Sequence, residues 1–294
     1  PLLGGVYAGH ARQLSARAAV PQLLAFATRG SLVDQTAALP APSQEPVFAG
    51  LDGGRGQLPL LLAQGLRVRT ETTERELVRT PTGWALTVGP TISPEQIDAS
   101  AVVLAVPAAP AARLLATIAP VASAELAGIE YASTAVVTFA CPAAVTAQLG
   151  QGASGFLVPP VDRRRIKAST FSFAKWDWVR RAGGEAGAIH LRTSLGRHGE
   201  EVALQSSDDE LVEASLLDLA SATGLATRPI ATHVQRWGGG LPQYAVGHLD
   251  RVSRIRAALP PGVVVAGAAY DGVGIPAVVA SADRGVAALV SHVS

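Results

Sequence analysis

Two short, uninterrupted apolar runs lie far apart in the sequence and constrain the fold more than any other feature. Ala101-Val-Val-Leu-Ala-Val106 has the length of a β-strand and is stopped by Pro107. Val263-Val-Val-Ala-Gly267 is of the same type and lies near the other end of the chain. Runs without polar alternation are typical of strands buried on both faces of a parallel or mixed sheet. Because a long stretch separates the two runs, we expect one domain in two halves, with a second domain inserted between them.

The rest of the chain predicts a mixed α/β pattern. Residues 11–38 carry spaced Leu and Ala and predict a helix, residues 38–46 hold three prolines and predict a linker, and residues 58–63 predict a short apolar helix. Ser207-Asp-Asp-Glu210 fits a capping box and predicts a helix start. Short strands are expected around Val68 and at residues 84–88, 134–140, 155–158 and 189–194.

Composition excludes several classes of protein. Hydrophobic residues make up 48% of the chain, charged residues 16%, and the formal net charge is +1, so we expect no nucleic-acid partner. The longest apolar runs are cut by Pro107, Pro120 and Pro142 before they reach the roughly 18 residues of a membrane span. Cys141 is the single cysteine, which favours a reducing compartment such as the cytoplasm, and no Cys/His cluster has the spacing of a metal site.

Gly150-Gln-Gly152-Ala-Ser-Gly155 matches the dinucleotide-binding pattern G-x-G-x-x-G. That pattern approaches a pyrophosphate only where a strand precedes it and a helix follows it. Here Phe156-Leu-Val158 and Pro159-Pro160 follow, which predicts a short strand and then a breaker. We therefore interpret the match as an ordinary loop and expect no nucleotide fingerprint in this chain.

The segment from Gly267 to Pro276 predicts a strand, a loop of small residues and the start of a helix. Such an arrangement can present amide N–H groups to a bound group at the helix N-terminus. An ordinary strand-to-helix turn has the same shape. The pattern by itself leaves both interpretations open.

Basic residues gather between residues 161 and 200, where nine Lys or Arg face four acidic residues for a net charge of +5. Residues 201–220 hold six acidic residues and no basic one. Arg pairs bidentately with carboxylates, so a cluster here could bind an acidic substrate, and a solvated loop is the alternative. The candidate substrate-binding residues are Arg163, Arg164, Arg165 and Lys167.

Single aromatic and imidazole side chains give weaker evidence of function. Trp176 and Trp178 flank Asp177 and either wall an apolar pocket or pack in the core. His248 is interpreted as a hydrogen-bonded structural group. The sequence has no Ser/His/Asp or Cys/His set that indicates covalent catalysis, so we assign no catalytic side chain and expect a cofactor to supply the chemistry.

Seven motifs in a fixed order resemble the protoporphyrinogen/coproporphyrinogen oxidase family, in a form typical of actinobacteria. This family lies within the wider group of amine-oxidase-like flavoproteins. Leu-Pro-Gln-Tyr and Asp-Gly-Val-Gly-Ile-Pro are specific to it within that group. The motifs are Pro-Leu-Leu-Gly-Gly-Val-Tyr-Ala-Gly (1–9), Leu-Asp-Gly-Gly (51–54), Ala-Val-Val-Leu-Ala-Val-Pro (101–107), Phe-Leu-Val-Pro-Pro (156–160), Arg-Trp (236–237), Leu-Pro-Gln-Tyr-Ala-Val-Gly-His (241–248) and Tyr-Asp-Gly-Val-Gly-Ile-Pro (270–276).

The resemblance implies an α/β fold that forms the C-terminal part of a two-domain FAD/NAD(P)-binding-like flavoprotein with an inserted mixed-sheet substrate domain. Residues 1–46 would end a helical or substrate-channel region, residues 47–110 and 236–294 would belong to the FAD-binding domain, and residues 111–235 would form the substrate-binding domain. The family's N-terminal fingerprint and its ribose-binding acidic residue have no match here. We therefore expect this chain alone to hold FAD weakly.

Matched by position, the residues facing FAD would be Thr72, Trp237, Gly267, Val273, Gly274 and Ile275. Thr72 lies at the end of the strand predicted from Val68 and departs from the family, which usually has Val there. The family's Val contacts adenine through its backbone. A backbone role is compatible with Thr72.

The implied activity is oxygen-dependent, FAD-linked oxidation of coproporphyrinogen III to coproporphyrin III in haem biosynthesis, with O2 as the acceptor for electrons taken from CH–CH groups. Protoporphyrinogen IX is the alternative substrate. A related flavin amine oxidase or desaturase, and a truncated chain without activity, are the alternative functions. The resemblance also implies a cytoplasmic protein, and it is compatible with a peripheral contact at the inner face of the cell membrane and with a homodimer.

Overall fold

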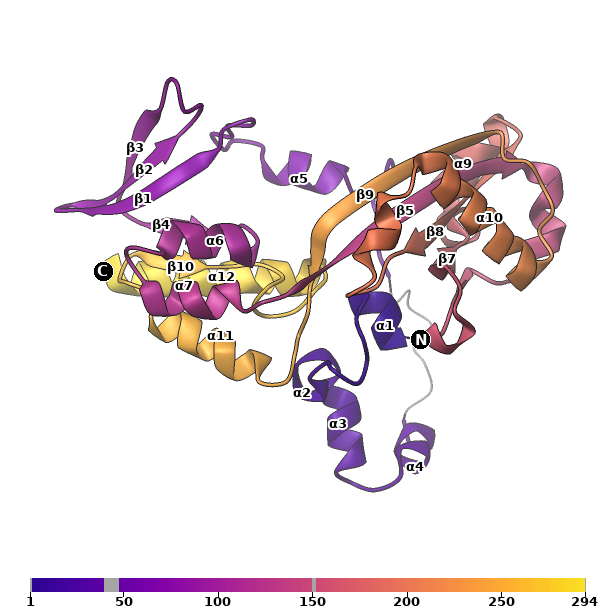
Figure 1. Ribbon diagram of the computed structural model, residues 1–294, viewed down its shortest axis with the longest axis horizontal. Helices are drawn as coiled ribbons and strands as arrows, with labels where there is room; N and C mark the ends of the chain where they lie inside the picture. The colour runs from indigo at the N-terminus through magenta and orange to yellow at the C-terminus, as the bar shows by residue number, and fades with distance from the viewer. Residues whose placement is uncertain (1, 40–47, 150–151, 294) are drawn as a thin grey trace. The chain divides into compact units, whose positions relative to one another are not determined.

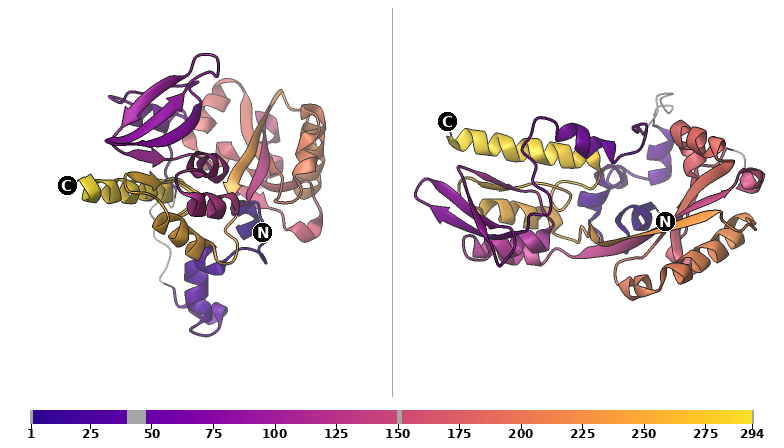
Figure 2. Two further views of the ribbon diagram at one scale, coloured as in Figure 1. Left: turned by 60° about the vertical axis from the view of Figure 1, so that its left-hand side comes forward. Right: turned by 90° about the horizontal axis from the view of Figure 1, so that it is seen from above.

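The computed structural model describes residues 2–39, 48–149 and 152–293. The chain forms two compact units, and Figures 1 and 2 show the elements of both. Unit 1 takes residues 1–12, 36–66 and 131–241, and unit 2 takes residues 13–35, 67–130 and 242–294. Each unit is thus assembled from three separate stretches of sequence.

Unit 1 is built on a five-stranded sheet (Figure 1) in the order β6-β7-β8-β5-β9. β5 pairs antiparallel with β8, β8 with β7, and β7 with β6. The strands predicted at residues 134–140, 155–158 and 189–194 are confirmed. The sheet consists of β5 (Tyr131–Pro142), β6 (Gly155–Leu157), β7 (Ile166–Thr170), β8 (Ala188–Leu195) and β9 (Ala231–Pro242).

The period-two alternation of β5 and β8 makes the two faces of this sheet different. Val137 of β5 and Leu191 of β8 are fully buried in one hydrophobic cluster with Leu211 of α10 (Asp208–Thr223). At about 25 cal/mol per Å² of apolar surface, each such side chain contributes roughly 1.5–3 kcal/mol when buried. The face that carries these residues is therefore committed to the core with α10.

The remaining helices of unit 1 are short. α8 and α9 contact β8, whereas α10 contacts β7 and β5. The apolar helix predicted at residues 58–63 is confirmed as α5. The helices are α1 (Leu2–Tyr7), α5 (Gln57–Leu62), α8 (Ser172–Lys175) and α9 (Asp177–Glu185), with 3-10 turns at Ala143–Leu149, Pro160–Asp162 and Glu201–Gln205.

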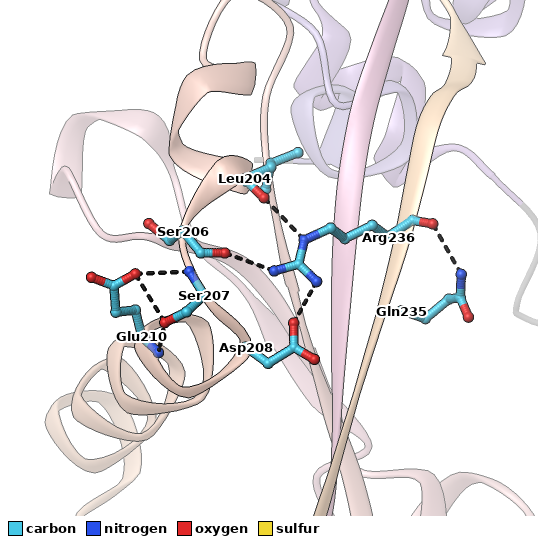
Figure 3. Close-up of polar contacts among 7 residues, drawn as sticks. All are labelled: Leu204, Ser206, Ser207, Asp208, Glu210, Gln235 and Arg236. Carbon is cyan, nitrogen blue, oxygen red and sulfur yellow. Dashed lines mark hydrogen bonds and ion pairs between the residues drawn. The ribbon is translucent and has the colours of Figure 1, made fainter.

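Helix α10 begins at the predicted capping box, which Figure 3 shows. The Ser207 hydroxyl accepts the Glu210 N–H at 3.3 Å, and the Glu210 carboxylate accepts the Ser207 N–H at 2.7 Å. Arg236 of β9 donates to the Asp208 carboxylate and to the Leu204 and Ser206 carbonyls. One guanidinium thus attaches the N-terminus of α10 and the turn before it to β9.

Unit 2 contains the two apolar runs at residues 101–106 and 263–267. They form β4 (Val102–Leu104) and β10 (Val263–Val265), which pair in parallel with Val263 opposite Val102. The two predicted strands and their place in one unit are confirmed. The predicted burial on both faces is wrong for Val103, which is 40% exposed. Only alternate residues of β4 point into the core. An antiparallel sheet precedes β4, made of β1 (Glu74–Thr80), β2 (Gly83–Val88) and β3 (Glu95–Ala99).

Two predictions fail in the N-terminal part of unit 2 and at its border. The helix expected over residues 11–38 is three short helices, α2 (Ala16–Ala19), α3 (Pro21–Ala27) and α4 (Leu32–Ala37). Val20 leaves helical geometry before Pro21, and Gly30 has a φ of 131°. Residues 67–73 form no strand, and β1 begins only at Glu74. The predicted linker lies mostly outside the described residues.

Four longer helices complete unit 2: α6 (Ala108–Leu115), α7 (Pro120–Ala127), α11 (His248–Ala257) and α12 (Ile275–Val293). α7 contacts α6 and α11, and α12 contacts β10. Among the described helices, none combines the length and the apolar character that a membrane crossing needs.

The unit boundaries fall at other residues than the predicted domain boundaries. The expected substrate domain starts at residue 111, inside α6, yet α6 and α7 belong to unit 2 because they pack on each other and α6 packs on β1. Residues 48–66 belong to unit 1, although they were expected with residues 47–110. What each unit binds stays a prediction.

Replacing Ser207 with Ala removes the hydroxyl that accepts the first-turn amide of α10. We expect the free energy of unfolding to fall by about 1 kcal/mol, the usual cost of losing such a cap. Urea denaturation measures the loss, and Ser206→Ala is the matched control because only the Ser206 backbone carbonyl takes part in the Arg236 contacts. Equal loss in both variants would contradict the assignment.

Candidate functional site

A cavity of about 490 Å³ opens on unit 1 where β5 and β8 face α8 and α9. On β8, His190 and Arg192 lie on the face opposite to the one that packs against α10. Thr138 of β5 lies opposite Arg192 in the strand register. α9 comes close here, since a Cβ at Gly183 would lie 3.1 Å from the His190 Nδ1. The volume is in the range of roughly 300–1,000 Å³ that small-molecule sites occupy.

Two tryptophans form walls of this cavity. Trp176 and Trp178 line it together with the loop around Gly50 and Gly54, so the structure places both indoles at the pocket. A Cβ at Gly50 would lie 2.8 Å from the Trp176 ring, so the glycine lets the indole lie against the loop backbone. The loop is also held to α9 through an Asp52–Arg181 ion pair at 3.2 Å.

The cavity carries positive charge without a counter-charge. Arg55 and Arg192 both line it, and neither forms an ion pair with a described acidic side chain. Desolvation and the nearby Arg55 charge lower the pKa of Arg192, although a guanidinium remains protonated at neutral pH. The buried Nδ1 of His190 has no hydrogen-bond partner among the described residues. These three side chains were not selected from the sequence.

The arginines that were selected from the sequence line a second cavity of about 250 Å³, also in unit 1. Arg164 lies 3.6 Å from Asp218, and Arg197 lies 3.7 Å from Glu200. Two guanidiniums of this cavity therefore already have carboxylate partners. The predicted residues along its wall are Arg163, Arg164 and Arg165.

Lys167 does not share that surface. It is 4% exposed, and its Nζ donates to the Gly196 carbonyl at 2.8 Å. The register of β7 against β8 shifts between Ile166 and Ala168, and the resulting bulge turns Lys167 inward. Desolvation, with a smaller effect of the Arg197 charge, lowers the pKa of Lys167 to about 7. Its burial argues against the predicted contact with substrate.

In unit 2, the predicted loop joins β10 to α12, which begins at Ile275 as expected. Gly274 has a φ of 110°, and a Cβ there would meet nothing within 4 Å, so the loop backbone is open at this point. The first amides of α12 have no acceptor within the helix. Together with the helix dipole they suit an electronegative group such as a ring carbonyl.

Asp271 holds this loop in place. Its carboxylate pairs with Arg256 of α11 and Arg284 of α12 and accepts the Ser281 hydroxyl at 2.6 Å, while that hydroxyl accepts the Gly267 N–H. Desolvation by itself would raise the pKa of Asp271, but the Arg256 and Ser281 hydrogen bonds outweigh it and the pKa is lowered. The ionised carboxylate therefore connects the loop to α11 and α12.

The motif at residues 241–248 supports the same loop. The Tyr244 hydroxyl donates to the Ala268 carbonyl at 2.5 Å, and its ring stacks on His248 with centroids 4.2 Å apart. Desolvation lowers the pKa of His248 to about 4, so this buried imidazole is neutral at neutral pH. His248 is buried as a structural group would be, although its Nε2 has no hydrogen-bond partner among the described residues.

The other predicted residues lie elsewhere. Thr72 is in the irregular segment before β1, and its hydroxyl donates to the Thr70 carbonyl at 2.9 Å. Trp237 is on β9 of unit 1 and is 56% exposed, whereas the loop belongs to unit 2. Gly150 falls outside the described residues, but β6 begins at Gly155 where a fingerprint would need a helix. Within the described ranges, no group of three His, Cys, Asp or Glu could hold a metal ion.

Comparison with known proteins gives one matching family, and the two relatives described below share one name. The family model described as flavin-containing amine oxidoreductase matches residues 1–290. The chain is 40% identical over 299 residues to the coproporphyrinogen III oxidase of Mycobacterium tuberculosis, covering 99% of this chain and 62% of that protein. It is 30% identical over 305 residues to the coproporphyrinogen III oxidase of Bacillus subtilis, covering 98% of this chain and 62% of that protein.

A solved structure has the same fold. A candidate protoporphyrinogen oxidase from Exiguobacterium superposes with a TM-score of 0.79 at 32% identity, covering 97% of this chain and 61% of that one. The chain therefore spans about three-fifths of the length of the relatives it matches.

Lys167 predicts an unusual dependence of stability on pH. Because its folded pKa of about 7 is below the unfolded value of about 10.5, the unfolded state binds more protons between these limits. The free energy of unfolding should therefore rise with pH over this window, by up to about 4 kcal/mol from this group. Lys167→Met removes that rise.

Urea denaturation at pH 7 and pH 9.5 measures the effect. The advantage of Lys167→Met over the wild type should shrink as the pH rises, whereas the exposed Lys175→Met should follow the wild-type profile. Parallel profiles for Lys167→Met and the wild type would show that Lys167 is not titrating from a buried site.

Proposed function

Since the chain belongs to the flavin-containing amine oxidoreductase family, we propose that it acts in the FAD-dependent oxidation of coproporphyrinogen III to coproporphyrin III. The supporting observation is the identity along nearly the whole chain with proteins named coproporphyrinogen III oxidase from Mycobacterium and Bacillus. The fold alone would leave the substrate undetermined, because one fold serves many reactions.

The loop before α12 suits a flavin. Its glycine backbone is open at Gly274, and the N-terminus of α12 offers amide donors and a positive dipole end to a ring carbonyl. We assign Gly267, Val273, Gly274 and Ile275 to this contact, and Thr72 and Trp237 to the same cofactor by resemblance. When bound, FAD would supply repeated two-electron oxidations of the porphyrinogen, with O2 as the final acceptor.

The unit 1 cavity suits the substrate. The indoles of Trp176 and Trp178 offer flat apolar walls to a tetrapyrrole, and the guanidiniums at the same cavity can orient its carboxylates. In this assignment, the protein positions the macrocycle and shields it from water, while the redox chemistry belongs to the cofactor. No side chain is assigned a covalent role.

Protoporphyrinogen IX stays the alternative substrate, because the Exiguobacterium neighbour is described as an oxidase of that compound. Amine oxidation is the alternative reaction within the family. Cytoplasmic location, a peripheral membrane contact and a homodimer stay predictions from the resemblance.

Oxidation of coproporphyrinogen III tests the proposal, since the porphyrin product fluoresces and the porphyrinogen does not. With excess FAD and air, the purified protein should form coproporphyrin III at least about tenfold faster than FAD alone, and hydrogen peroxide should accumulate with it. Protoporphyrinogen IX and a simple amine are assayed beside it. A rate equal to that of FAD alone, or a preference for the amine, would refute the proposal.

A further inference from the structure

We propose that Arg55 and Arg192 form a carboxylate-binding pair that makes the unit 1 cavity select a tetrapyrrole by its propionate groups. The idea rests on the proposed function for the identity of the ligand. It goes beyond that function because it assigns substrate selectivity to two named side chains.

The two guanidiniums come from distant parts of the sequence and meet at one cavity. Arg55 lies in the turn before α5, and Arg192 lies in β8 opposite Thr138. Gly50 and Gly54 of the same turn line the cavity beside the two indoles. The packing of the turn on Trp176, together with the Asp52–Arg181 ion pair, fixes Arg55 on the Arg192 side of unit 1.

The charges at this cavity are unbalanced. Neither Arg55 nor Arg192 has a carboxylate partner among the described residues, and the Arg55 charge disfavours the charged form of Arg192. An anion between them would relieve that repulsion and accept hydrogen bonds from both forks. The second cavity differs, because Arg164 and Arg197 already pair with Asp218 and Glu200.

His190 is a third polar side chain that lines the cavity. Its Nδ1 is buried near Gly183 of α9, away from the open cavity, and has no hydrogen-bond partner among the described residues. The ligand is therefore inferred from the two unpaired guanidiniums and the two indoles. A tetrapyrrole with carboxylate arms supplies apolar surface for the indoles and oxygen atoms for the guanidiniums.

Selectivity follows from the substituents of the two candidate substrates. Coproporphyrinogen III carries a propionate on each of its four rings, whereas protoporphyrinogen IX keeps two of these propionates and has vinyl groups on the other two rings. In the proposed site, the ring edge that differs between the two substrates lies at Arg55 and Arg192, where a vinyl group would desolvate a guanidinium without pairing it. A site built to pair polar groups rejects an analogue that lacks them more strongly than an apolar pocket rejects an extra group.

Binding of the porphyrin products tests the pair without requiring turnover. Coproporphyrin III and protoporphyrin IX are titrated into the 294-residue chain, and quenching of the fluorescence of its four tryptophans reports binding. Arg55→Gln and Arg192→Gln should each weaken coproporphyrin III binding by roughly five- to tenfold and protoporphyrin IX binding by less than about twofold. Arg192→Lys, which keeps the charge, should recover part of the loss.

Arg228→Gln is the matched control, since Arg228 is an exposed arginine of unit 1 that has no described ion-pair partner and does not line the cavity. It should change neither affinity by more than about twofold. Equal losses for both porphyrins in the Arg55 and Arg192 variants, a loss in Arg228→Gln as large as theirs, or no porphyrin binding by the wild type would each overturn the inference.

The two proposals fail separately. A wild type that binds coproporphyrin III through Arg55 and Arg192 but does not oxidise coproporphyrinogen III refutes the oxidase function and supports the pair. A wild type that oxidises coproporphyrinogen III but binds both porphyrins independently of these arginines refutes the pair and supports the function.

Discussion

The alternation of side chains along β5 and β8 is the constraint on which the proposed substrate cavity depends. Val137 and Leu191 commit one face of the sheet to the core with α10. The opposite face is then free to present His190 and Arg192, which core packing does not use. A register slip of one residue would exchange the two faces, burying the guanidinium and exposing the apolar cluster. The β5–β8 pairing thus determines both which residues form the core and which side chains line the cavity.

In unit 2, a network of contacts around the Asp271 carboxylate holds the loop that we assign to the flavin. Asp271 connects α11, α12 and the loop after β10, and the stacked Tyr244–His248 pair supports the loop from the motif at residues 241–248. Two motifs that are distant in sequence therefore serve one structural purpose. The loop that we assign to the flavin is held by charge and hydrogen bonds as well as by the burial of Ala269 and Tyr270, which suits a site that must keep its geometry for a ligand.

Local signals predicted those parts of the structure that local interactions determine. The strands β4 and β10, the capping box at Ser207 and the start of α12 near Pro276 all follow from short patterns. Lys167 shows the limit, because a bulge in β7 reversed its direction and no residue pattern announced that bulge. The meeting of Arg55 with Arg192 is tertiary, and only the glycines of residues 50–54 hinted that a turn approaches another element there.

The central claim is that a tetrapyrrole binds on the β5–β8 face between the two tryptophans and the two arginines. A crystal structure of the protein with coproporphyrin III tests it most directly. We predict that the macrocycle lies against Trp176 and Trp178, with propionate oxygens within hydrogen-bond distance of Arg55 and Arg192. A macrocycle bound instead at the Arg163–Arg165 cavity, or one that leaves Arg55 and Arg192 without a carboxylate, would contradict it.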